Sequence, residues 1–173
     1  HMVYALKLFW VCLRYKVNFI HSHWVGEPTH VVRKVSKVLK IPYIVTSHGG
    51  DVNCVPEIGY GECLTPYLKK QNQKNLEEAS HIIAVSPHMK TSIKSLIQKQ
   101  RPISIIPNIL EYSPYDNEKP LNNKKKVILT VARNAPVKHY ELALNAIKQL
   151  SLKRQDFMYR IIGKGTEDLQ AQV

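Results

Sequence analysis

Short apolar runs alternate along this chain with longer amphipathic stretches, and this alternation constrains the fold more than any other feature. The runs typical of strands cover residues 17–21, 43–47, 81–85 and 103–106. The stretches typical of helices cover residues 3–15, 28–40, 66–80 and 87–99. Strands that alternate with helices are typical of parallel sheets built from βαβ units. The sequence therefore predicts an α/β fold.

A polar segment divides this pattern in two. Residues 111–126 contain two prolines, three asparagines and almost no aliphatic side chains, a composition typical of a linker. Beyond it the alternation restarts, with a predicted strand at 127–132, a helix at 140–152 and a strand at 157–162. Each half is short for a complete doubly wound domain, so we expect two sheets and two incomplete domains.

The charge is strongly positive, because 25 Lys and Arg side chains face 13 Asp and Glu and give a formal net charge of +12. Such a charge favours polyanionic partners, including phosphates, nucleotides and anionic membranes. The basic residues are dispersed and form no nucleic-acid-reading motif, so we expect no nucleic acid partner. Three cysteines without a CxxC pair predict no disulfide scaffold and a reducing, cytoplasmic compartment.

Polar residues directly follow several predicted strands, where ligands of open parallel sheets bind. His48, Gly49, Gly50 and Asp51 follow the second strand. Paired glycines allow a ligand to approach the backbone, and an imidazole and a carboxylate can hydrogen-bond a hydroxyl-rich ligand. A tight turn whose histidine only caps a neighbour is the alternative interpretation.

Two cations, Arg133 and Lys138, lie across the predicted turn between a strand and a helix. Such a loop can direct both side chains at a phosphate, with help from the amides of the helix N-terminus. Two solvated surface cations are the alternative. Gly163 and Gly165 form a further turn after the last strand, which either lines a nucleotide or simply turns the chain.

Metal and lipid binding rest on weaker patterns. His21 and His23 share one side of a strand and could be metal ligands, and so could His48, Cys54 and Cys63. Neither set has the spacing of a metal site, so we expect no metal. A basic helix face with Arg33, Lys37 and Lys40, close in sequence to Trp10 and Phe9, predicts peripheral contact with an anionic membrane, against the simpler alternative of a solvated face.

Six segments together resemble the family 4 (group 1) glycosyltransferases of the GT-B fold. They occur in the order of the family's motifs and cover most of the chain. They are IHSHW (20–24), KIPYIVTSHGGDV (40–52), ASHIIAVSPHMK (79–90), ISIIPNILE (103–111), VILTVARNAPVKHYELALNAIKQL (127–150) and YRIIGKGTEDLQ (159–170).

The resemblance implies Rossmann-like domains with the active site in the cleft between them. Residues 1–110 would be the latter part of the N-terminal, acceptor-side domain, 111–126 the linker, and 127–173 the start of the C-terminal, nucleotide-sugar-binding domain. It implies sugar transfer from a UDP- or GDP-linked donor to a glycan, lipid-linked or small-molecule acceptor, with retention, without metal or other cofactor, at the cytoplasmic side of a membrane.

The resemblance also assigns roles to single residues. Arg133 and Lys138 would bind the donor diphosphate and stabilise its charge as it leaves. His48 would act catalytically by hydrogen-bonding the transferred sugar. Gly49 and Asp51 would lie on the acceptor side, and the nucleotide would lie beside the turn formed by Gly163 and Gly165.

Several family features are missing from the chain. The glycine-rich first loop and the acidic E-x7-E motif are absent, and Ala132 and His139 replace glycines of the family pattern. We therefore expect a fragment with no substantial transferase activity alone. A non-catalytic α/β module that binds a nucleotide or a partner protein is the alternative function.

Overall fold

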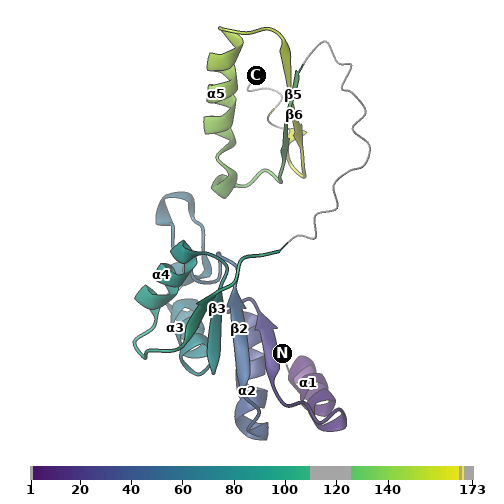
Figure 1. The fold of residues 1–173 in the computed structure, drawn as a ribbon, viewed down its shortest axis with the longest axis vertical. Helices are drawn as coiled ribbons and strands as arrows, with labels where there is room; N and C mark the ends of the chain where they lie inside the picture. The colour runs from purple at the N-terminus through teal and green to yellow at the C-terminus, as the bar shows by residue number, and fades with distance from the viewer. Residues whose placement is uncertain (1, 110–125, 168, 170–173) are drawn as a thin grey trace. The chain divides into compact units, whose positions relative to one another are not determined.

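The computed structural model describes residues 2–109, 126–167 and 169 of the chain. Two compact units make it up, His1–Leu110 and Glu111–Val173, each with its own parallel sheet (Figure 1). The predicted linker lies outside the described residues except for Lys126, which is the first residue of a strand.

The first unit is a four-stranded parallel sheet with strand order β1-β2-β3-β4. Its strands are β1 (Ile20–His23), β2 (Tyr43–Ser47), β3 (His81–Ala84) and β4 (Ile103–Ile105). Its α-helices are α1 (Met2–Arg14), α2 (Glu27–Leu39), α3 (Pro66–Glu77) and α4 (Pro87–Leu96), with two 3-10 turns, Pro56–Ile58 and Glu62–Leu64, before α3. The predicted α/β class with parallel sheets is confirmed.

Proline and capping residues set the starts of the helices. Proline occupies the first or second position of α2, α3 and α4, where its missing N–H costs nothing. Ser86 caps α4, because its hydroxyl accepts a hydrogen bond from the Met89 amide at 3.1 Å. Helix α2 ends at Leu39, and its C-cap, Lys40, has a left-handed φ of 57° just before Ile41 and Pro42.

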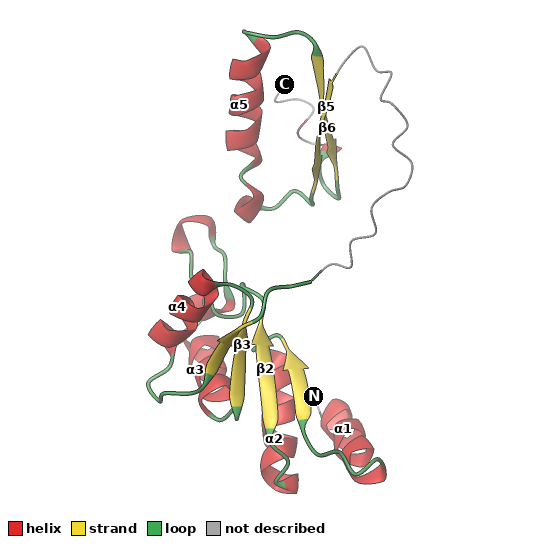
Figure 2. Ribbon diagram, viewed as in Figure 1, coloured by secondary structure: helices red, strands yellow, loops and turns green. Residues whose placement is uncertain are grey.

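The first sheet is covered by helices on one face (Figure 2). Ile20, Tyr43, Val45, Ile82 and Ala84 belong to a single buried cluster with side chains from all four helices. The alternate strand positions lie on the opposite face, because successive side chains of a strand point to opposite sides. That second face includes four polar residues, of which His21 and His23 are exposed and His81 and Ser104 are half-buried.

Three elements have bounds that differ clearly from the sequence prediction, and one of them is α3, which ends at Glu77, three residues before the predicted end at 80. The first strand was predicted at 17–21 but spans Ile20–His23, because its partner in the sheet is β2, with Ile20 opposite Tyr43. Histidine and serine are weak strand formers, so the pattern of the strand's second half is not visible in the sequence. Helix α4 ends at Leu96, three residues before the predicted end at 99.

The second unit is a two-stranded parallel sheet with one helix. It contains β5 (Lys126–Val131), a 3-10 turn (Pro136–Lys138), α5 (Tyr140–Ser151) and β6 (Phe157–Ile162). Tyr140 and Leu144 of α5 form a small buried cluster with Leu169. The opposite sheet face leaves Val127, Leu129 and Val131 exposed among the described residues.

Candidate functional site

Two loops lie side by side at the carboxyl edge of the second sheet. The Ala132 amide donates to the Ile162 carbonyl at 3.0 Å, and the Asn134 amide donates to the Lys164 carbonyl at 2.9 Å. The structure therefore brings the predicted cation loop after β5 together with the predicted glycine turn after β6. This is the edge at which parallel sheets bind ligands.

Glycine is required in this turn for two reasons. A Cβ on Gly163 would lie 1.9 Å from the Ala132 carbonyl oxygen, so only glycine allows the two loops to touch. Gly165 has a φ of +73°, a left-handed value that favours glycine. Both glycines thus have structural reasons to be present, and their proximity to a nucleotide stays a prediction.

Arg133 and Lys138 are exposed on the cation loop. Among the described residues neither side chain has a hydrogen bond or an ion pair. Helix α5 begins directly after Lys138, and its N-cap, His139, has a φ of 47° and provides no side-chain cap. Uncapped amides and free cations at one sheet edge are suited to an anion such as a phosphate.

Lys164 adds a third exposed cation to this edge, at the centre of the glycine turn. Sequence reasoning noted it only as part of that turn. The signal that identifies it is its carbonyl bond to Asn134, which places it beside the loop that carries Arg133.

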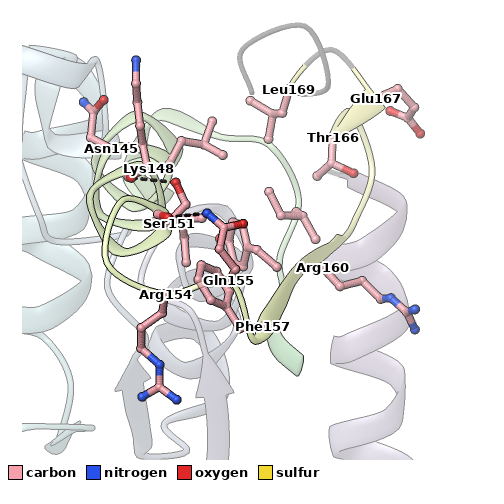
Figure 3. A pocket seen from close by; sticks show the side chains of 14 residues that line it. Asn145, Lys148, Ser151, Arg154, Gln155, Phe157, Arg160, Thr166, Glu167 and Leu169 are labelled. Carbon is pink, nitrogen blue, oxygen red and sulfur yellow. Dashed lines mark hydrogen bonds between the residues drawn. The ribbon is translucent and has the colours of Figure 1, made fainter. Parts of the chain in front are cut away.

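A cavity of about 730 Å³ lies elsewhere in the second unit (Figure 3). Its walls come from α5, from β6, from the loop between them and from Thr166, Glu167 and Leu169. None of the four predicted donor-site residues of this unit lines it. We therefore do not place the donor site in this cavity.

In the first unit, Asp51 organises the loop that follows β2. The residue is 0% exposed. Its carboxylate accepts hydrogen bonds from the Val25 amide at 2.9 Å, the Ser47 hydroxyl at 2.9 Å and the Gly49 amide at 2.8 Å. All these donors come from the protein, so the carboxylate holds the loop backbone instead of presenting oxygens to solvent. That Asp51 and its loop lie on the acceptor side stays a prediction.

A second set of buried contacts attaches the following loop to the core. Asn72 donates to the Asp51 carbonyl at 2.7 Å and to the Glu62 carboxylate at 2.8 Å. The Trp24 indole donates to the other Glu62 oxygen at 2.8 Å, and the Glu62 amide donates to the Gly50 carbonyl at 2.8 Å. Sequence reasoning missed Glu62 and Asn72, because their partners are 10 to 38 residues away along the chain.

Three histidines meet at the ends of β1 and β2. Nδ1 of His23 lies 3.0 Å from Nε2 of His48, and the two rings are stacked with centroids 5.3 Å apart. The His21 ring lies next to the His23 ring, with ring centroids 4.3 Å apart, and Nε2 of His21 is 2.8 Å from the Thr46 hydroxyl. Burial lowers the pKa of His21, and the neighbouring imidazoles of His23 and His48 lower it further.

The three histidines raise the question of a metal site, for which the sequence predicts none. Within the described part of the chain, no group of three or more His, Cys, Asp or Glu side chains is arranged to bind a metal ion. Cys54 is exposed and Cys63 is buried, with its Sγ 3.7 Å from the Asp51 carbonyl oxygen. Burial raises the pKa of the Cys63 thiol to about 11.

The basic face of α2 differs from its predicted form. Arg33 donates to Asn75 at 3.0 Å and forms an ion pair with Glu78 at 2.8 Å, and its side chain is only 15% exposed. It connects α2 to α3 and is not a free surface cation, whereas Lys37 and Lys40 are exposed. No helix among the described residues is long and apolar enough to cross a membrane.

Comparisons with known proteins identify the chain's relatives. The family profile described as Glycosyltransferase Family 4 matches residues 1–112, and that of Glycosyl transferases group 1 matches residues 113–173. No curated protein matches the chain significantly. Among solved structures, the chain is similar to one chain of the GtfA/B complex, with a TM-score of 0.62 at 17% identity over 97% of its length.

A second similar structure is the S. aureus MnaA–UDP co-structure, with a TM-score of 0.52 at 13% identity over 99% of the chain. At these identities the two structures support the fold alone. The chain spans 34% of the length of the GtfA/B chain and 47% of the MnaA chain.

Proposed function

The chain belongs to Glycosyltransferase Family 4, and from this premise we propose that it carries part of the machinery for transferring a sugar from a nucleotide-sugar donor. The acceptor in this proposal is a glycan, a lipid-linked sugar or a small molecule. The transfer retains the anomeric configuration and needs no metal. The observation that carries the proposal is the pair of unpaired cations at the carboxyl edge of β5.

The donor diphosphate would bind at this edge through Arg133 and Lys138. Charge-assisted hydrogen bonds from these side chains would neutralise the negative charge that develops on the leaving nucleotide. The free amides at the start of α5 would add favourable dipoles. The UDP in the MnaA co-structure belongs to that protein, but its presence is consistent with nucleotide binding in this proposal.

The transferred sugar would be bound by His48 of the first unit. Its backbone is held by the buried carboxylate of Asp51, since the Gly49 amide next to it donates to that carboxylate at 2.8 Å. A loop held this firmly can present an imidazole to a hydroxyl group without first becoming ordered. Gly49 and Asp51 contribute to the acceptor side in this proposal by shaping the loop.

Calorimetry with UDP, GDP and their sugars tests the donor site. We expect one nucleotide to bind better than the other, and Arg133→Ala and Lys138→Ala each to weaken its Kd by about 10- to 100-fold, since a hydrogen bond to a charged group contributes about 1.5–3 kcal/mol. Lys153→Ala is the matched control, because Lys153 is an exposed cation just beyond the other end of α5. Equal losses in all three variants would contradict the proposed site.

The same measurement separates the competing functions. A non-catalytic binding module would bind nucleotide or a partner protein but show no turnover in any longer form of the protein. A nonspecific polyanion binder would ignore the nucleobase and lose affinity steeply with salt. We expect the 173-residue chain itself to bind without substantial turnover.

We further propose that the protein acts in the cytoplasm and touches an anionic membrane through α1. This helix exposes Leu6, Trp10 and Leu13, each about 60% accessible, beside the cations Lys7 and Arg14. Apolar side chains flanked by cations are typical of interfacial helices. Flotation with anionic vesicles should show binding that Trp10→Ser abolishes, and no binding at low salt would end the proposal.

A further inference from the structure

His48 is held on its backbone side by Asp51, but a ring also needs a fixed orientation and a defined proton position to bind a hydroxyl group. The ring's own contact in the structure is with His23. Their nitrogens, Nε2 of His48 and Nδ1 of His23, lie 3.0 Å apart, which is a normal hydrogen-bond distance.

This contact follows from the topology of the sheet. His21 and His23 are alternate residues of β1, so both lie on the face away from the helices. In the parallel register, His23 is opposite Thr46 of β2, two residues before His48. The end of β2 therefore places the His48 ring beside His23, although the two residues are 25 positions apart.

The hydrogen bond restricts the protons of both rings. One of the two facing nitrogens must carry a hydrogen and the other must offer a lone pair. If both rings were fully protonated, two N–H groups would face each other and the bond would be lost. A neutral His48 therefore has its single proton on a nitrogen decided by this contact.

His21 supports the arrangement from the other side. Its ring lies against that of His23, and its Nε2 is bound to the Thr46 hydroxyl at 2.8 Å. The rings of His21 and His48 on either side limit how far the His23 ring can turn. Because neighbouring imidazoles also lower the pKa of His21, the cluster disfavours additional positive charge.

We propose that His23 is a positioning residue for His48: it holds Nε2 of His48, fixes the orientation and tautomer of that ring, and leaves Nδ1 as the ring nitrogen that meets the sugar. The role of His48 at the sugar rests on the proposed function, whereas the coupling between the two rings does not. His23 itself touches no substrate in this proposal.

Nitrogen NMR of the ¹⁵N-labelled 173-residue chain tests the coupling, because the shifts of ring nitrogens report which of them is protonated. Assignments among the eight histidines follow from single substitutions. At neutral pH we expect His48 to show one protonated and one unprotonated ring nitrogen. In His23→Phe, which keeps a stacked ring but removes the hydrogen bond, both shifts should move toward the average of two exchanging tautomers.

Two further variants make the test specific. His23→Asn places a polar atom close to the position of Nδ1 and should restore the separated shifts, at least in part. His81→Phe is the matched control, since His81 lies on the same sheet face and is bonded to a hydroxyl, that of Ser104, at 2.9 Å. It should leave the His48 shifts unchanged, and tryptophan fluorescence should show that all variants remain folded.

The proposal is overturned if His23→Phe leaves the His48 shifts as they are, or if His48 already shows averaged tautomers in the unaltered chain. Nucleotide binding measured on the same variants separates this result from the proposed function. Absence of any nucleotide binding would remove the sugar-binding role of His48 and leave the ring coupling standing. Normal nucleotide binding together with unchanged His48 shifts would remove the ring coupling and leave the proposed function standing.

Discussion

Replacing Asp51 with asparagine tests whether this carboxylate stabilises the loop or serves to bind a ligand. In the structure, one oxygen accepts from the Ser47 hydroxyl and the Gly49 amide, and the other accepts from the Val25 amide and, at 3.4 Å, from the His48 amide. Asparagine can replace only one of these oxygens as an acceptor. Its amide group would face the Val25 N–H, or the Ser47 and Gly49 donors, without a bond.

The expected cost is large for a change of so few atoms. A buried hydrogen bond to a charged group contributes about 1.5–3 kcal/mol, and a buried donor left unpaired costs about 1–3 kcal/mol more. We therefore expect Asp51→Asn to reduce the free energy of unfolding of the first unit by about 3–5 kcal/mol. A domain of this size is stable by only about 5–15 kcal/mol, so the variant would be marginal.

Urea unfolding followed by tryptophan fluorescence measures this loss in the first unit alone, since both tryptophans, Trp10 and Trp24, belong to it. With a slope of about 1–3 kcal/mol per molar urea, the midpoint should fall by about 1–5 M. Glu57→Gln is the control, because Glu57 is an exposed carboxylate of the same loop. A loss below about 1 kcal/mol in Asp51→Asn would refute the structural role.

Three other changes have defined outcomes. Gly163→Ala should destabilise the second unit by about 1–3 kcal/mol or more, since the new Cβ would lie 1.9 Å from a backbone oxygen, and amide exchange of α5 and β6 would report it. Among the three cysteines, Cys54 should react with a thiol reagent in the native chain and the two buried ones only after unfolding. The pKa of His21 is lowered by burial and by neighbouring imidazoles, so its folded form binds a proton less readily than the unfolded form, whose pKa is near 6.5. Stability should therefore fall as the pH drops below about 6.5, and the fall should be smaller in His21→Asn.

Local patterns were sufficient to predict most of the elements. Apolar runs of four to six residues identify strands β2, β3 and β5, proline at helix starts identifies α2, α3 and α4, and amphipathic periodicity identifies α5, each to within a few residues. The exception is β1, in which histidine and serine alternate, so that its apolar periodicity is weak. Its boundaries depend on pairing with β2, which is a contact between residues more than 20 positions apart.

The candidate site was predictable only where the residues are close in sequence. Arg133 and Lys138 lie on one turn, so a spacing of five residues suggests a shared anion. Whether Asp51 faces solvent or the protein interior cannot be read from its neighbours, because the Val25 amide that it binds comes from the end of another strand. The sequence predicted ligand contacts for the Asp51 carboxylate. In the structure it accepts hydrogen bonds from backbone amides and from the Ser47 hydroxyl.

The amino-acid sequence by itself determined the α/β class, the division into two parallel sheets and the family, because these depend on periodicity and on the order of short motifs. The tertiary structure decided the partners of individual side chains: that Arg33 pairs with Glu78, that Asp51 is buried, and that His23 holds His48. The physical reason is the range of the interactions. Periodicity acts over a few neighbouring residues, whereas hydrogen bonds form wherever folding brings a donor and an acceptor to about 3 Å.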